Sequence, residues 1–142
     1  MIKINAEVMA IALNEIGVTE VPGGKHNPRI LEYFAEIGHE WVDDDETAWC
    51  AAFANYVLKM AGINGSGKLN ARSFLDVGHE TKTPAIGDLV VFWRESPKSW
   101  KGHIAFFVRE TEEYVYVLGG NQRNKVSIQA YPRKRLLEYR RI

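Results

Sequence analysis

The sequence predicts an α+β fold in which N-terminal helices pack on a C-terminal antiparallel sheet. Its 142 residues approach the length of one typical domain, about 150 residues. The chain is 46% hydrophobic and 25% charged, as globular proteins are. The spacing of apolar residues changes once, near residue 84, from helical to strand-like. Helices followed by a run of strands are typical of α+β proteins, and we expect a single domain over residues 1–142.

Apolar residues at helical spacing predict three helices and a fourth, short one in the first half of the chain. In the second helix, Asn27 is a suitable N-cap and Pro28 suits the first helical position. The predicted helices run from an N-cap at Asn5 to Gly17, from Asn27 to Gly38, from Cys50 to Gly62, and over 71–77.

The second half of the chain consists of β-branched and aromatic runs separated by charged or glycine-containing turns, a pattern that predicts strands. The predicted strands are 89–93, 103–109, 114–118 and 126–131. Because they follow one another closely, we expect an antiparallel sheet packed against the helices.

Charge and hydropathy exclude several classes of function. Eighteen basic residues balance eighteen acidic ones, so bulk positive charge does not favour nucleic acid as a partner. The longest apolar run, residues 48–54, has seven residues, against about 20 for a membrane span. No small-residue cleavage site follows the first apolar stretch, so we expect no signal peptide.

Cys50 is the single cysteine, which excludes an internal disulfide and a multi-cysteine metal site. It lies in the first turn of the third predicted helix, where free N–H groups and the helix dipole stabilise a thiolate. The alternative is a small buried thiol that fills a contact between helix and sheet.

His103 is the best candidate for a base beside that thiol. It opens a predicted strand, after Gly102 and ahead of an apolar run that would hold the imidazole rigidly at a cleft. The alternative is a surface histidine on an edge strand. Among the other histidines, His26 lies in a polar loop, and His39 and His79 follow glycines at predicted helix ends, which suits capping.

The position of Asn121 follows from the predicted hairpin. If the chain turns at Glu112, paired residues have numbers that sum to 224, and His103 lies opposite Asn121. A turn centred one half-step earlier places His103 opposite Gly120 instead. Opposed side chains lie about 4.5–5.5 Å apart, close enough for an amide oxygen to bond an imidazole N–H. An exposed turn asparagine is the alternative.

Together these three residues could hydrolyse an amide. His103 would hold Cys50 as a thiolate–imidazolium pair, and Asn121 would orient the ring. The thiolate would attack the carbonyl, His103 would protonate the leaving amine, and water would release the acyl-enzyme. The backbone N–H of Cys50 is a natural oxyanion donor. No second donor is evident, and no cofactor is expected.

Four motifs in this order resemble a known family. They are Trp49-Cys50-Ala51-Ala52-Phe53, Gly87-Asp88-Leu89-Val90-Val91-Phe92, Gly102-His103-Ile104-Ala105 and Gly119-Gly120-Asn121-Gln122. The sequence is similar to the CHAP group of cysteine, histidine-dependent amidohydrolases/peptidases, relatives of the NlpC-type papain-like hydrolases. The resemblance implies a papain-like α+β fold and cleavage of an amide bond in peptidoglycan. It also implies Cys50 as nucleophile, His103 as base and Asn121 as orienter.

One position departs from the family pattern. Many CHAP enzymes have a glutamate two residues before the asparagine, where this sequence has Gly119, so a four-membered catalytic set is not supported. Two other functions stay open: an inactive cell-wall-binding or phage-structural module of the same fold, and a cysteine hydrolase of another amide, such as an isopeptide bond. We expect a peptidoglycan hydrolase made in the cytoplasm to reach the wall through a holin or a secretion system.

Other residues suggest weaker hypotheses. Trp49 and Trp100 flank the proposed catalytic residues and are candidates for substrate binding. The acidic run that begins with Asp43, Asp44 and Asp45 suggests calcium, but it lacks the glycine and glutamate of an EF-hand loop, and a solvated helix start fits it better. We therefore expect no metal.

Overall fold

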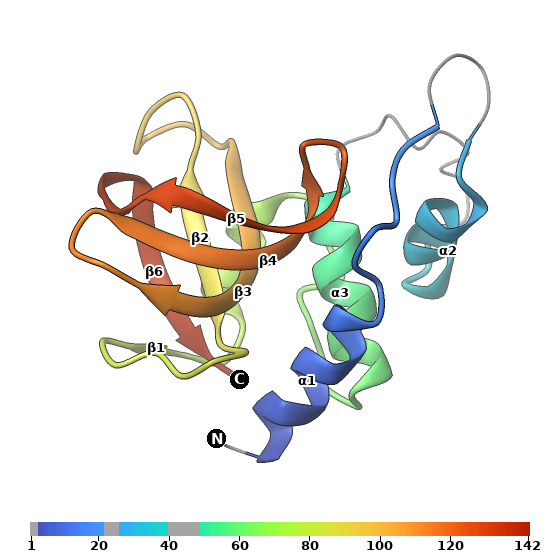
Figure 1. Cartoon of the computed structure of the whole chain (residues 1–142), viewed down its shortest axis with the longest axis horizontal. Coiled ribbons are helices and arrows are strands. Elements are labelled where there is room, and N and C mark those ends of the chain that lie inside the picture. Colours follow the sequence, from blue (N-terminus) through green and yellow to red (C-terminus); the bar gives the residue numbers. More distant parts are fainter. Residues whose placement is uncertain (1–2, 22–25, 40–48) are drawn as a thin grey trace.

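The computed structural model describes residues 3–21, 26–39 and 49–142 (Figure 1). The described helices are α1 (Lys3–Leu13), α2 (Pro28–Glu36) and α3 (Cys50–Met60), with short 3₁₀ helices at Ala71–Asp76 and Arg133–Arg135. The strands are β1 (His79–Thr81), β2 (Leu89–Trp93), β3 (Gly102–Glu110), β4 (Tyr114–Gln122), β5 (Lys125–Pro132) and β6 (Leu136–Arg141). In the described part of the chain they form one antiparallel sheet, in the order β1-β6-β2-β3-β4-β5.

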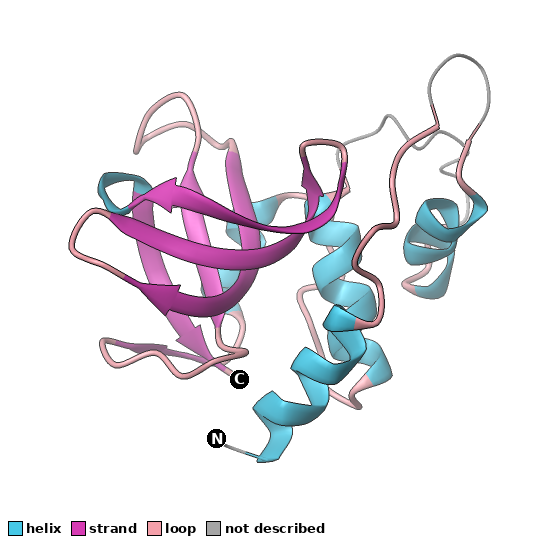
Figure 2. Cartoon of the chain, in the orientation of Figure 1, coloured by secondary structure: helices cyan, strands magenta, loops and turns pink. Residues whose placement is uncertain are grey.

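The three described α-helices gather on one side of the molecule and the sheet on the other, with α3 against the sheet (Figure 2). Every residue of α3 from Cys50 to Leu58 is buried, as expected for a helix that contacts α1, α2, β3 and β4. A helix enclosed in this way holds its first residue in a fixed position against the sheet. The site at Cys50 therefore lies where the two layers meet.

The sheet has an apolar cluster on each face. The larger cluster joins α1, α2 and α3 to β2, β3 and β4, and its largest fully buried members include Tyr33, Phe34, Phe53 and Phe106. The smaller one, on the strands alone, consists of Val90, Phe92, Ala105, Phe107, Val115, Val117 and Tyr139. Alternate residues of β2 and β3 thus belong to opposite clusters, which is the period of a strand buried on both faces.

The predicted helices match the structure at α2 and α3. The Asn27 side chain accepts a hydrogen bond from the backbone N–H of Arg29 at 2.9 Å, as an N-cap does. The third helix begins at Cys50, as predicted. The prediction for Asn5 is wrong, because α1 begins at Lys3 and Asn5 lies inside it, fully buried.

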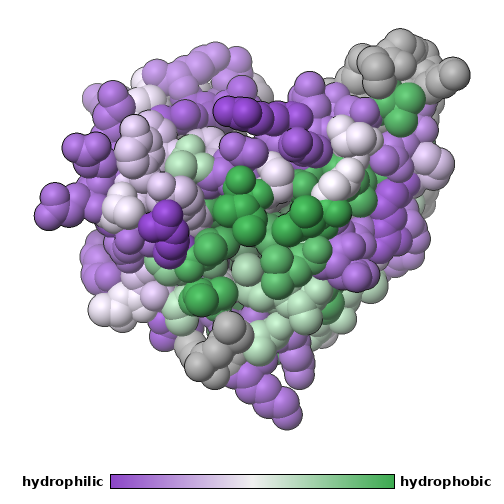
Figure 3. Space-filling model, viewed as in Figure 1, coloured by the Kyte–Doolittle hydropathy of each residue, from purple (hydrophilic) through white to green (hydrophobic). Residues whose placement is uncertain are grey.

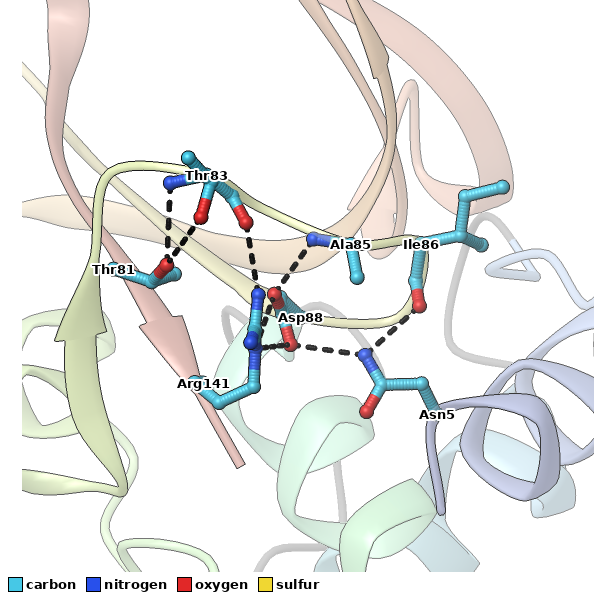
Figure 4. Close-up of polar contacts among 7 residues, drawn as sticks. All are labelled: Asn5, Thr81, Thr83, Ala85, Ile86, Asp88 and Arg141. Atoms are coloured by element: carbon cyan, nitrogen blue, oxygen red, sulfur yellow. Dashed lines mark hydrogen bonds and ion pairs between the residues drawn. The ribbon is translucent and has the colours of Figure 1, made fainter. Parts of the chain in front are cut away.

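Asn5 instead belongs to a buried polar network around Asp88 (Figure 4). Its Nδ2 donates to Asp88 Oδ1 and to the carbonyl of Ile86, both at 2.9 Å. Asp88 Oδ2 accepts from the backbone N–H of Ala85 at 2.8 Å, and Arg141 Nε lies 3.0 Å from the same oxygen. The carboxylate therefore ties α1, the turn before β2 and the last strand together.

The structure adds two strands that the sequence pattern did not predict. β6 lies between β1 and β2 within the sheet, although half of its six residues are charged. The predicted register of β3 and β4 is confirmed where Phe106 pairs with Leu118 and Phe107 with Val117, because both pairs sum to 224. Nearer the turn the register shifts by one, at an irregularity between Phe107 and Arg109.

Figure 3 shows that apolar side chains gather in the middle of the face seen in Figure 1, with polar residues around them. Over the whole surface, the exposed large apolar side chains include Leu13, Ile16, Ile86 and Ile128. None of the described helices has the length and hydropathy of a membrane-spanning segment.

Candidate active site

A polar pocket of about 370 Å³ lies at the N-terminal end of α3. It is lined by Cys50, Arg94, His103, Asn121, Asn124, Tyr131 and Arg135. These residues come from the start of α3, the loop after β2, the three strands β3, β4 and β5 with their hairpin, and the second 3₁₀ helix. The structure thus brings the three residues proposed as catalytic, Cys50, His103 and Asn121, to one pocket.

The hairpin between β4 and β5 reaches the start of α3 (Figure 1) because Gly120 has no side chain. A Cβ at Gly120 would lie 2.7 Å from Phe53 Cβ and 2.8 Å from a ring carbon of Trp49. Backbone bonds also join the hairpin to the segment after α1: Glu20 N–H donates to Asn124 O at 2.9 Å, and Val126 N–H to Val18 O at 2.8 Å.

Cys50 is nearly buried, with 7% of its surface exposed. Burial raises the pKa of the Cys50 thiol, while hydrogen bonds from the backbone of Ile104 and Ala51 and the positive charge of Arg94 act in the opposite direction. At a given pH, a larger fraction of this thiol is therefore protonated than in a free cysteine. Among the described residues, no hydrogen bond joins its sulfur to His103, although both side chains line the pocket.

His103 is also nearly buried, with 6% of its surface exposed. Its ring stacks on Tyr131 with 5.0 Å between the ring centroids. The pKa of His103 is lowered to about 4: burial lowers it most, the hydrogen bond with Gln122 partly opposes this, and the charges of Arg94 and Arg135 lower it as well. At neutral pH the imidazole is uncharged, so the resting site favours a neutral pair rather than the thiolate–imidazolium pair expected from the sequence.

The amide that holds His103 belongs to Gln122. His103 Nε2 lies 2.8 Å from Gln122 Oε1. The other end of this amide, Nε2, donates to the carbonyls of Ser127 at 2.7 Å and Val117 at 3.3 Å. These two bonds fix which end of the amide faces the ring, so His103 Nε2 carries the proton and donates it. His103 Nδ1 is then the nitrogen that can accept a proton.

The sequence analysis assigned the orientation of His103 to Asn121, and the structure corrects this assignment to Gln122. The β4–β5 pairing shifts between Gly119 and Gln122, and Asn121 has a φ of 57° in the left-handed region. This irregularity interrupts the alternation of side chains on which the hairpin argument depended. Asn121 lines the pocket, but the hydrogen bond to His103 comes from Gln122.

Gly119, the position at which this sequence departs from the family pattern, leaves space for the Gln122 amide. A Cβ at Gly119 would lie 2.7 Å from Gln122 Oε1 and 2.8 Å from Ala105 Cβ. The Gln122 amide thus occupies the space that a side chain at position 119 would need. The glycine at this position excludes a four-membered catalytic set, as the sequence indicated, but the sequence did not point to Gln122.

The two tryptophans have different environments. Trp49 is fully buried, and its Nε1 donates to Glu20 Oε1 at 2.8 Å, so its prediction as a cleft residue is wrong. It packs beside Tyr33 in the core, with 6.1 Å between ring centroids. Trp100 is 72% exposed and lines a second pocket, of about 250 Å³, that Cys50 and Arg94 also border.

Sequence reasoning missed five residues of the site: Gln122, Arg94, Asn124, Tyr131 and Arg135. The arginines follow strands or lie in turns, where a charged residue normally indicates only solvent. Tyr131 was placed in a strand, with no sign that it would stack on the histidine. For a metal, no group of three or more His, Cys, Asp or Glu side chains occurs among the described residues. The acidic run at Asp43, Asp44 and Asp45 lies outside the described residues.

Comparison with solved structures relates this fold to the NlpC/P60 proteins. The chain resembles an NLP/P60-family lipoprotein-like protein of Staphylococcus aureus (TM-score 0.57, 17% identity), covering 99% of this chain and 42% of that one. It resembles the P60 domain of an M. avium paratuberculosis antigen (TM-score 0.55, 16% identity), covering 99% and 94%. It also resembles a hypothetical invasion protein of Mycobacterium tuberculosis (TM-score 0.56, 14% identity), covering 96% and 60%.

These likenesses confirm the predicted papain-like α+β fold. The chain spans less than half of the S. aureus protein. No curated protein matches the sequence. A family model, the CHAP domain, matches residues 42–121. This match includes Cys50, His103 and Asn121 and extends over more than half of the 142 residues. The chain therefore belongs to the CHAP family, as its sequence motifs predicted.

Proposed function

We propose that this chain is a cysteine amidase or endopeptidase that cleaves an amide bond in bacterial peptidoglycan through an acyl-enzyme. The observation that carries the proposal is the shared pocket of Cys50 and His103, with His103 Nε2 bound to Gln122. A nucleophile at a helix N-terminus, a base, and a group that orients the base are the parts that such a reaction needs. Membership in the CHAP family supports the same reaction.

The charge state of the pair defines the first step. Because the Cys50 pKa is raised and the His103 pKa is lowered to about 4, the free site holds a thiol and a neutral imidazole at pH 7. His103 Nδ1 accepts the thiol proton as the sulfur attacks the substrate carbonyl. Catalytic hydrogen bonds of this kind are often long without substrate and tighten in the complex, which agrees with the absence of a direct bond between the two described side chains.

The remaining steps return the proton. The carbonyl oxygen gains negative charge as the S–C bond forms, and the backbone N–H of Cys50 at the start of α3 stabilises it. The C–N bond then breaks, and His103 gives its proton to the leaving amine. Water, deprotonated by His103, attacks the thioester and releases the acid, which restores the thiol.

The two pockets that Cys50 borders suit a polymer that continues beyond the cleaved bond. The first pocket contains His103 and the second contains Trp100, while Cys50 and Arg94 border both. Trp100 offers an exposed aromatic surface, and the ammonium of Lys101 lies 5.7 Å from its ring centroid. We propose that Trp100 packs against the substrate, and that the protein reaches the wall through a holin or secretion system.

Digestion of purified sacculi tests the proposal. The wild type should release new amino and carboxyl ends that mass spectrometry identifies, and Cys50→Ala, checked for folding by circular dichroism, should release none. Equal release by Cys50→Ala would overturn the mechanism. Binding to sacculi without new ends in the wild type would instead identify an inactive wall-binding module. The absence of both binding and cleavage would exclude peptidoglycan and favour another amide.

A further inference from the structure

The pocket beside Cys50 is rich in groups that donate hydrogen bonds. Its lining residues include two arginines, Arg94 and Arg135, two asparagines, Asn121 and Asn124, and Tyr131, whose side chains all carry donors. Burial, more than any other cause, raises the pKa of Tyr131 to about 12, so this hydroxyl stays protonated and neutral at pH 7. No carboxylate lines the pocket among the described residues. Such a lining favours a ligand that is anionic and accepts several hydrogen bonds.

Arg94 directly follows β2 and its side chain is exposed. Its backbone closes the loop to β3 through a bond from its N–H to Lys101 O at 3.2 Å. The neighbouring carboxylate, Glu95, is paired with Lys101 Nζ at 2.8 Å. Among the described residues, no side chain forms an ion pair with Arg94. The guanidinium that borders both pockets is therefore available to a ligand.

Arg135 is held in place without using all of its donors. Its Nε donates to Trp93 O at 3.1 Å, and its guanidinium carbon lies 5.7 Å from the ring centroid of Tyr131 and 5.9 Å from that of Trp93. In the described part of the chain its two terminal nitrogens have no hydrogen-bond partner. The bond from Nε and the two ring contacts hold the guanidinium and leave its terminal nitrogens for a carboxylate, whose geometry they match.

We propose that Arg94 and Arg135 form a carboxylate-binding subsite beside Cys50, so that the preferred substrate carries a free carboxylate close to the amide that is cut. The preference for a peptidoglycan peptide with a free rather than an amidated carboxyl group rests on the proposed function. The subsite itself does not, because it is a property of the pocket around the sulfur.

The first test uses two reagents that alkylate Cys50 by the same reaction. Iodoacetate and iodoacetamide both lose iodide as the thiolate forms an S–C bond, but only iodoacetate carries a carboxylate. The ratio of their rates should exceed the ratio measured for a small free thiol. Arg94→Gln combined with Arg135→Gln should lower this ratio about tenfold, because charge-assisted hydrogen bonds to the carboxylate are lost. Any change in thiol pKa affects both reagents equally and cancels in the ratio.

A matched control is Arg109→Gln, which removes the same charge from an exposed arginine on β3 that stacks on Tyr116 and lines neither pocket. It should leave the ratio unchanged. The proposal is overturned if the ratio in the double variant equals that of the wild type, or if Arg109→Gln lowers it as much.

The second test compares two synthetic stem peptides that differ only in a free or an amidated carboxyl group next to the scissile bond. The wild type should cleave the free acid with the lower KM, and the double arginine variant should lose this preference. A retained iodoacetate preference without cleavage of either peptide would contradict the proposed function and leave the subsite supported. Equal cleavage of both peptides by the wild type would contradict the carboxylate preference and support the hydrolase.

Discussion

His103 is controlled by one amide whose two ends have separate partners. Gln122 Nε2 is bound to carbonyls of β4 and β5, so its Oε1 can only accept from the ring. This arrangement sets the imidazole tautomer before substrate arrives, which is the role that an orienting residue has in such sites. The orientation of the base is therefore determined by a residue that does not line the pocket.

Gln122→Met tests this assignment, because methionine fills a similar volume and accepts only weakly. We expect His103 to lose its single tautomer and its pKa to fall below about 4, since the bond with Gln122 raises that pKa. Turnover should fall about tenfold to hundredfold, the cost of an unsatisfied buried donor. Nitrogen NMR shifts of the ring measure the tautomer. The control is Asn121→Gly, which keeps the left-handed φ and should leave the tautomer unchanged. If Asn121→Gly also lost the single tautomer, Asn121 would be the orienting residue after all.

The lowered pKa of His103 also predicts how stability depends on pH. The folded value of about 4 lies below the reference value of 6.5, so the unfolded chain binds this proton first. The stability that the neutral His103 contributes to the folded state is fully present above pH 6.5. It is lost as the pH falls toward 4, and the total loss is about 3 kcal/mol. Urea unfolding across this range should show the loss in the wild type and a smaller one in His103→Leu. His79→Leu, at an exposed position, should behave as the wild type; equal losses in all three proteins would contradict the prediction.

At the level of elements, the sequence predicts best where one face is apolar and the ends carry specific signals. α2 and α3 have both, the strands β2 to β4 contain continuous apolar runs, and β5 alternates apolar and polar residues over 126–129. β1 and β6 were missed because they are short or polar, and pair with each other through the backbone. The site was predictable as far as Cys50 and His103, whose elements were found. That Gln122 rather than Asn121 bonds the imidazole was not predictable. One irregularity between Gly119 and Gln122 changes which of the two side chains points toward His103.

The approach of the β4–β5 hairpin to α3 depends on the missing side chain at Gly120. In Gly120→Ala the new Cβ would lie within 3 Å of Trp49 and Phe53, so the hairpin must move. We expect a loss of about 1–3 kcal/mol in the free energy of unfolding and a fall in turnover, because Gln122 moves with the hairpin. The comparison is Gly17→Ala, where φ is +97° but nothing lies within 4 Å; it should cost stability through backbone strain alone and retain turnover. Wild-type stability and turnover in Gly120→Ala would show that the close approach is not needed.

At the scale of the whole molecule, the site is assembled from two layers. Cys50 comes from the helices, and His103 and Gln122 come from the sheet, so the proposed reaction requires that these layers keep their relative positions. Near the pocket, Trp49 and Gly120 provide the contact. Away from the pocket, the Asp88 network joins α1 to the sheet (Figure 4). The aspartate of the family motif, Asp88, thus has a structural role, and so has Gly87, whose φ is +92° and where a Cβ would lie 2.9 Å from Asn5 O.

Asp88→Ala tests whether this second contact holds the layers together. The variant leaves the backbone N–H of Ala85 and Nε of Arg141 without their acceptor, and the Asn5 amide keeps only the carbonyl of Ile86. We expect a loss of about 3 kcal/mol in the free energy of unfolding, measured in urea, because a buried ion pair is broken from one side. Asp76→Ala, at an exposed position, should cost less than about 0.5 kcal/mol.

A double-mutant cycle with Arg141→Ala separates the ion pair from the other bonds of Asp88. Because Arg141 keeps partial exposure, with 25% of its side chain accessible, its own removal should cost less than that of Asp88. The two losses should add to more than the loss in the double variant, since the second substitution removes a charge that the first left unpaired. Strict additivity would mean that Asp88 acts through Asn5 and Ala85 alone. A cost below 1 kcal/mol for Asp88→Ala would show that the helices keep their place on the sheet without this network.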